Sequence, residues 1–130
     1  MIKPGGVKRS VRVAERVREE IARALTRDLS DPRLEHAVVT RVEVPDDLSL
    51  CRVFVRLATG SEESAARARL VAGLDAAKGL LRKRVGQSIG LRRAPELRFQ
   101  YDEGQDASER IDRVLHEIER DRLRGPDSDR

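Results

Sequence analysis

The residues that could perform catalysis or hold a metal ion are few and scattered along the chain. His36 and His116 lie far apart and Cys51 is the only cysteine, so none has a companion at metal-ligand spacing. No serine lies in a nucleophile-elbow context, and no phosphate-loop or dinucleotide-binding glycine pattern occurs. Asp46 and Asp47 could hold a divalent cation, although turn residues of this type more often make local hydrogen bonds. The sequence therefore predicts no enzymatic activity, no metal and no cofactor.

Positive charge, in contrast, is concentrated in two segments without acidic residues. Residues 76–95 carry +6 and residues 1–14 carry +4, so a net charge of +4 leaves −6 on the remainder. Clustered Lys and Arg side chains are typical of nucleic-acid binders, with an ordinary solvated face as the alternative. A helix that begins near Gly79 would also direct its free N–H groups toward a phosphate. The predicted RNA-binding residues are Lys8, Arg9, Arg12, Lys78, Gly79, Arg82, Lys83, Arg84, Arg92 and Arg93.

Aromatic side chains number only three, and all lie in predicted strands. Phe99 shares a face with Leu97, which predicts a place in the core, whereas the pattern does not assign Phe54 and Tyr101. Domains that read single-stranded RNA stack its bases on exposed aromatics. The shortage therefore argues against base stacking and favours recognition of the phosphates and shape of folded RNA.

Length and composition fit one globular domain. The chain has 130 residues, of which 38% are charged and 38% hydrophobic. No apolar run approaches a membrane span, and no apolar segment follows the basic N-terminus as a secretory signal would require. A single cysteine excludes an internal disulfide framework. We therefore expect a cytoplasmic protein without membrane contact.

Hydrophobic periodicity predicts the element order α-β-β-α-α-β-α, with a three-stranded sheet covered by helices on one face. Ser10 is the expected cap of a first helix that ends at Asp31-Pro32. Alternation predicts a hairpin of strands 38–44 and 51–57, with Val38, Thr40, Val42 and Val44 on one face and buried Cys51 in the second strand. A helical stretch follows from residue 62, interrupted at Gly79, and a third strand covers 96–101.

An Asp106/Glu109 capping pattern then opens a last amphipathic helix, whose apolar positions are Ile111, Val114, Leu115 and Ile118. The domain prediction is a flexible basic arm over 1–9, one folded domain over 10–119 and a disordered tail over 120–130.

Several short motifs, in order from about Arg9 to Ile118, resemble the ribosome-binding factor A family. Asp31-Pro32-Arg33-Leu34 and the stretch from Pro95 to Asp102 are the most specific, and Glu35, Cys51, Gln105 and Ser108 depart from the family pattern. The remaining matches are Arg12-Val13-Ala14, Val42-Glu43-Val44, Asp47-Leu48, Ala77-Lys78-Gly79 and Leu91-Arg92.

The resemblance implies a type II K-homology (KH) α+β fold, with a helix–kink–helix at Ala77-Lys78-Gly79 and an extra C-terminal helix. It also implies a non-catalytic, monomeric assembly factor of the small (30S) ribosomal subunit, acting in late 16S rRNA maturation and processing and in cold adaptation. The implied partners are 16S rRNA and free small subunits rather than mature 70S ribosomes, with ribosome-associated GTPases assisting release.

Two other functions stay open on the residues alone. The basic face could meet an acidic protein partner in an interaction module, or the chain could be an rRNA-processing nuclease, although no clustered acidic site supports the nuclease. Gly79 also has a purely structural alternative, as a helix glycine that packs closely against the sheet.

Overall fold

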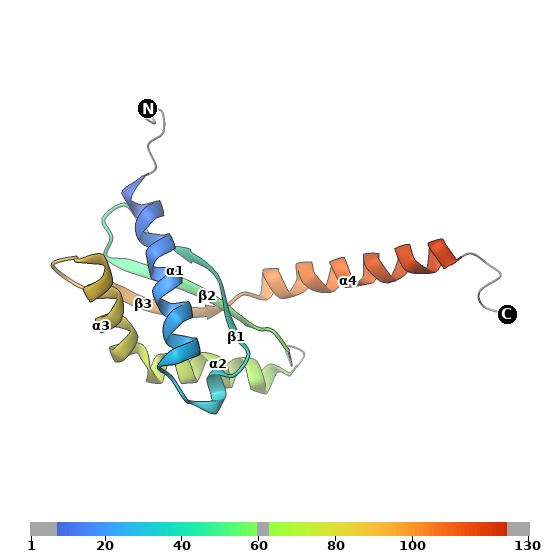
Figure 1. The fold of residues 1–130 in the computed structure, drawn as a ribbon, viewed down its shortest axis with the longest axis horizontal. Helices are drawn as coiled ribbons and strands as arrows, with labels where there is room; N and C mark the ends of the chain where they lie inside the picture. The colour runs from blue at the N-terminus through green and yellow to red at the C-terminus, as the bar shows by residue number, and fades with distance from the viewer. Residues whose placement is uncertain (1–7, 60–62, 125–130) are drawn as a thin grey trace.

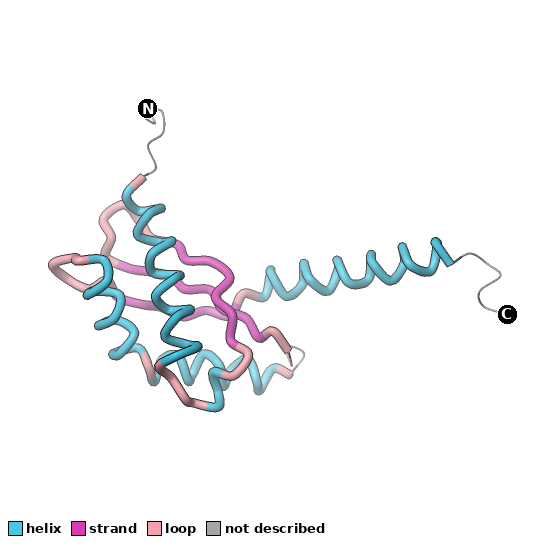
Figure 2. The backbone as a smooth tube through the Cα atoms, viewed as in Figure 1, coloured by secondary structure: helices cyan, strands magenta, loops and turns pink. Residues whose placement is uncertain are grey.

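Three helices cover one face of a three-stranded sheet in the computed structural model, and a fourth helix points away from it (Figures 1 and 2). The structure describes residues 8–59 and 63–124. The predicted order of elements is confirmed. In chain order the elements are α1 (Arg9–Arg27), a 3-10 turn η1 (Pro32–Leu34), β1 (Ala37–Glu43), β2 (Leu50–Leu57), α2 (Ser64–Ala76), α3 (Lys78–Ile89), β3 (Glu96–Tyr101) and α4 (Glu103–Arg124).

The sheet is mixed and has the strand order β1-β2-β3. β1 pairs antiparallel with β2, which confirms the predicted hairpin, and β3 pairs parallel with β2. A parallel neighbour needs a long crossover connection, and the α2–α3 pair provides it. This crossover returns the chain to the start of β3, where Glu96 pairs with Leu50.

The core lies between the sheet and helices α1, α2 and α3. From the sheet side, Phe99 and alternate residues of β2 are buried, which confirms the core positions predicted for Phe99 and Cys51. From the helix side, the fully buried residues include Val17, Ile21, Leu70, Leu74, Leu81 and Val85.

A β-bulge in β1 overturns part of the predicted strand pattern. Thr40 is the extra residue between Val39 and Arg41, so the side-chain alternation changes phase at this point. Before the bulge Val39 packs in the core, whereas after it Val42 does. The prediction of one face shared by Val38, Thr40, Val42 and Val44 is therefore wrong for its first half.

The ends of α1 also differ from the prediction. Lys8 precedes the helix, and Ser10 lies inside it, where its Oγ donates a hydrogen bond to Asp46 Oδ1 at 3.1 Å. Ser10 thus joins α1 to the β1–β2 turn instead of capping the helix. The helix ends at Arg27, and the Asp31 carboxylate caps η1 by accepting from the Arg33 N–H at 2.9 Å.

The break between α2 and α3 is confirmed, but it falls at Ala77, whose backbone has φ −90° and ψ 1°. Gly79 belongs to the first turn of α3. At the C-terminus α4 begins at Glu103, before the predicted Asp106 cap, and runs through Arg124. The helix thus continues five residues into the predicted tail, since no glycine or proline occurs between Gly104 and Gly125-Pro126.

The predicted apolar stripe of α4 is not packed on the domain, because Ile111, Val114, Leu115 and Ile118 are all more than half exposed. No described helix combines the length and apolarity that a bilayer crossing requires. Most of the predicted arm and the last six residues of the predicted tail lie outside the described residues.

Burial makes Cys51 a probe of the intact fold. Desolvation raises the pKa of its thiol to about 11, and only the thiolate is the reactive nucleophile. We expect native protein at pH 8 to react with an aromatic disulfide reagent at least about 100-fold more slowly than protein in denaturant, because two pKa units remove that much thiolate. Equal rates in both conditions would contradict the buried position of Cys51.

Candidate nucleic-acid interface

The structure gathers four of the predicted basic residues around one hollow of about 610 Å³. Arg9 comes from the start of α1 and Arg82 from α3, while Arg92 and Arg93 come from the α3–β3 loop. The two acid-free segments of the sequence therefore meet in space. The rest of the lining comes from Leu91 and from the chain segments Asp47–Ser49 and Ala94–Glu96.

Side-chain contacts between α1 and α3 bring these segments together. Arg16 Nε donates to Ser88 Oγ at 3.0 Å, and Ser88 Oγ donates to Glu20 at 3.0 Å. At the other end of the pair, Arg84 forms an ion pair with Asp28. The two helices are thus antiparallel, and the N-terminus of α1 lies beside the C-terminus of α3.

A tight turn after α3 positions the two loop arginines. Gly90 ends the helix at φ +71°, a conformation that side chains with a Cβ rarely adopt. The following chain passes so close to the helix that a Cβ on Gly86 would lie 2.9 Å from the Ala94 Cβ. Arg82 Nη2 donates to the Ala94 carbonyl oxygen at 3.1 Å, so this guanidinium is held at the hollow's wall.

The β1–β2 turn forms another wall of the hollow. Asp47 accepts hydrogen bonds from Ser49 Oγ at 2.8 Å and from the Ser49 N–H at 3.2 Å, which lowers the pKa of the carboxyl. The local role predicted for Asp47 is confirmed, and the described residues contain no cluster of three metal-ligating side chains. Leu48 has φ +59°, a strained conformation for a bulky residue and one that often marks a functional site.

Other predicted residues lie away from the hollow. Lys78 and Gly79 begin α3, about 16 Å along the helix axis from its end. Lys78 Nζ lies 3.6 Å from Asp75, and Arg84 is engaged by Asp28. Lys8, Arg12 and Lys83 are exposed but do not line the hollow. The predicted basic surface is therefore divided, and one compact part of it is concave.

Gly79 is exposed, and a Cβ at this position would have no neighbour within 4 Å. The structural alternative, in which Gly79 packs closely against the sheet, is therefore wrong. A phosphate at the first turn of α3 stays a prediction.

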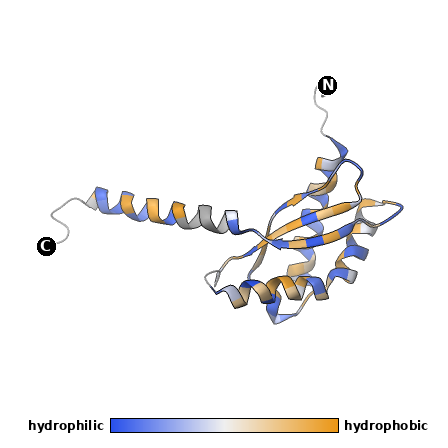
Figure 3. Ribbon diagram, turned by 180° about the vertical axis from the view of Figure 1, so that it is seen from behind, coloured by the Kyte–Doolittle hydropathy of each residue, from blue (hydrophilic) through white to orange (hydrophobic). Residues whose placement is uncertain are grey.

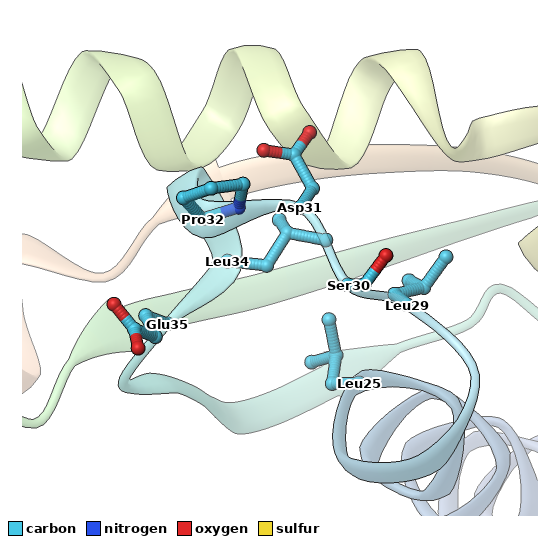
Figure 4. Close-up of a pocket in the computed structure, with 7 residues that line it drawn as sticks. All are labelled: Leu25, Leu29, Ser30, Asp31, Pro32, Leu34 and Glu35. Carbon is cyan, nitrogen blue, oxygen red and sulfur yellow. The ribbon is translucent and has the colours of Figure 1, made fainter.

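A second hollow, of about 290 Å³, lies on the other end of α1 and contains none of the predicted RNA-binding residues (Figure 4). The Asp31 carboxylate at its edge is paired with the Arg33 guanidinium at 2.7 Å, and these hydrogen bonds lower the pKa of Asp31. This hollow therefore follows from the local turn between α1 and β1. Its lining residues are Leu25, Leu29, Ser30, Asp31, Pro32, Leu34 and Glu35.

Sequence reasoning missed the polar wall of the basic hollow. Asp47 and Ser49 had a visible signal in their turn pattern, but nothing in the sequence places that turn beside Arg92. Glu96 also lines the hollow and adds an acidic group to its rim. Charge clustering singled out the arginines of the hollow, whereas the positions of Asp47, Ser49 and Glu96 beside them depend on tertiary packing.

A mixed sheet with α1 and a broken α2–α3 pair on one face defines a type II KH-like domain. The sequence model of ribosome-binding factor A matches residues 9–115, and the chain belongs to the ribosome-binding factor A family. The ribosome-binding factor A of Sorangium cellulosum is 53% identical over 114 residues, which cover 88% of this chain and 91% of that relative.

Solved structures agree with this fold. The crystal structure of ribosome-binding factor A from Thermus thermophilus superposes with a TM-score of 0.60 at 23% identity, over 71% of this chain and 93% of that one. A homology model of the Thermus thermophilus protein, fitted into a cryo-EM map of its complex with the 30S subunit, gives a TM-score of 0.50 at 27% identity. That match covers 71% of this chain and 89% of the other.

Two glycines of α3 should respond in opposite directions to substitution by alanine. Gly79→Ala adds a methyl group in open space and should raise the free energy of unfolding by about 0.5–1 kcal/mol. Gly86→Ala forces a contact with Ala94 and should lower it by about 1–3 kcal/mol. Urea denaturation measures both, and a Gly86→Ala variant as stable as wild type would contradict the close approach.

Proposed function

We propose that this protein binds the small ribosomal subunit by holding 16S rRNA phosphates in the hollow lined by Arg9, Arg82, Arg92 and Arg93. In this proposal it is a monomeric, non-catalytic assembly factor that acts in the cytoplasm during late 16S rRNA maturation and processing and during growth in the cold. Its partners are free small subunits rather than mature 70S ribosomes, and ribosome-associated GTPases assist its release.

The observation that carries the proposal is that four arginines from three separate parts of the chain line one hollow. Arginine binds phosphate through two parallel hydrogen bonds, which gives geometric specificity as well as attraction. The homology model of the Thermus thermophilus protein, fitted into a cryo-EM map of its complex with the 30S subunit, supports the same kind of partner.

The shape of the hollow indicates how binding would work. Arg82 is fixed by the Ala94 carbonyl oxygen, while Arg92 and Arg93 are exposed on a loop held by Gly86 and Gly90. A cation that is already held in place, as Arg82 is, loses little conformational freedom when it meets a phosphate. Because phosphate contacts carry no base sequence directly, the hollow would recognise the shape of a structured rRNA region.

Removing the four guanidinium groups should abolish binding without unfolding the protein. The Arg9→Gln, Arg82→Gln, Arg92→Gln, Arg93→Gln variant should lose co-sedimentation with small subunits in a sucrose gradient. With about four phosphates neutralised, wild-type affinity should fall by roughly 10²-fold between 50 and 200 mM salt, and the variant should show a much weaker dependence.

A charge-matched control replaces Arg18, Arg27, Arg69 and Arg113 by Gln, since these arginines lie outside the hollow. Retained binding by the quadruple hollow variant would contradict the site. Recovery of the same partner after RNase treatment would favour an acidic protein partner, and metal-dependent RNA cleavage by the pure protein would favour a nuclease.

A further inference from the structure

We propose that the uncovered face of the sheet is a second RNA surface, on which the Arg41–Phe54 pair stacks a base of single-stranded RNA. This inference goes beyond the proposed function, because the basic hollow would hold phosphates of folded rRNA and stacks no base. In Figure 3, where the molecule is seen from behind, no described helix covers this face.

The alternation of β2 places Phe54 on the uncovered side of the sheet. Cys51, Val53 and Val55 are buried toward the helices, so Phe54 and its neighbours Arg52 and Arg56 point the other way. Phe54 is half-buried and does not belong to the core cluster. It is the aromatic residue that the core does not use.

Arg41 lies over this ring, so a stacked base would meet the Arg41 guanidinium together with the ring. The β-bulge puts Arg41 directly opposite Phe54 in the register, and its guanidinium carbon lies 4.0 Å from the centre of the ring. Arg41 Nε also lies 3.7 Å from Asp102 Oδ2, which helps to fix the guanidinium in place. Aromatic rings and guanidinium planes are the two kinds of surface on which proteins stack unpaired RNA bases.

The charges around the Arg41–Phe54 pair are suited to a polyanion. In the register Arg52 lies between Glu43 on β1 and Arg98 on β3, so one of its two cross-strand neighbours carries a like charge, which is unfavourable. Arg98 lies 3.8 Å from Glu96 in an exposed pair, and Arg52 has no ion-pair partner in the described part of the chain.

A small apolar hollow completes the surface at the hairpin end of this face. It has a volume of about 280 Å³ and is lined by Val44, Pro45 and Leu50 between the charged residues Glu43 and Arg52. A flat base beside a phosphate fits this combination, whereas a duplex keeps its bases stacked inside and an acidic peptide carries charge without flat rings. Single-stranded RNA is therefore the occupant that the face fits.

Phe54→Trp provides a direct reporter, because the chain has no tryptophan of its own. Full-length protein is titrated with an eight-nucleotide oligoadenylate, with an abasic oligonucleotide of equal length, and with a short RNA duplex. Oligoadenylate should quench the tryptophan fluorescence by stacking, and the abasic strand should not. Equal responses to oligoadenylate and the abasic strand would overturn the proposal.

Anisotropy with labelled oligoadenylate tests the wild-type ring itself. Phe54→Leu keeps an apolar side chain but removes the ring, and should weaken binding by about 5- to 100-fold. Phe54→Tyr should retain the affinity, and circular dichroism checks that each variant is folded. Unchanged affinity in Phe54→Leu, or stronger competition by an acidic peptide than by RNA, would refute the stacked base.

The double variant Arg52→Gln, Arg98→Gln should weaken binding of oligoadenylate and of the abasic strand, whereas Arg18→Gln should change neither. The quadruple hollow variant separates the two surfaces: it should lose small-subunit binding and keep the oligoadenylate response. Failure of the open face therefore leaves the proposed function intact, and failure of the hollow leaves this proposal intact.

Discussion

The antiparallel packing of α1 against α3 determines where the positive charge of this protein gathers. Because the start of α1 lies beside the end of α3, Arg9 reaches the same hollow as Arg82 and the α3–β3 loop. The contacts that hold this arrangement are polar at both ends, with Ser88 between Arg16 and Glu20 and Arg84 against Asp28. A substitution at these contacts would therefore shift the walls of the hollow, although none of these residues lines it.

Charge clustering in the sequence predicted a set of RNA-binding residues, but not which of them would lie together in the fold. Arg84 belongs to the same acid-free segment as Arg92, yet it serves the packing of two helices rather than the hollow. Helix periodicity does not show which turn of α3 faces α1, since this depends on the crossover to β3. The close approach of Gly86 to Ala94 fixes the path of the chain from α3 to β3. A glycine in the sequence does not by itself show which residue packs against it.

The order of elements follows from hydrophobic periodicity because each long segment has one apolar face. Local irregularities do not follow from it, and the bulge at Thr40 is the clearest case, since one extra residue reverses the faces of half a strand. The sequence pattern did not assign Phe54 to the core or to the surface, and it did not predict Arg41 as its partner, because the bulge sets that register. A small number of aromatics therefore says little about base stacking until the position of each one is known.

The uncovered sheet face also depends on how the chain leaves β3. The Asp102 N–H donates to the Val55 carbonyl oxygen at 2.7 Å, and Asp102 Oδ2 lies 2.6 Å from Thr40 Oγ1, so the residue before α4 is tied to both other strands. With its first turn held there, α4 points away from the sheet (Figure 1), and Phe54 stays half-buried. The bulge that places Arg41 over Phe54 thus also supplies the hydroxyl that directs α4 away, and one irregularity in β1 determines both the Arg41–Phe54 contact and the direction of α4.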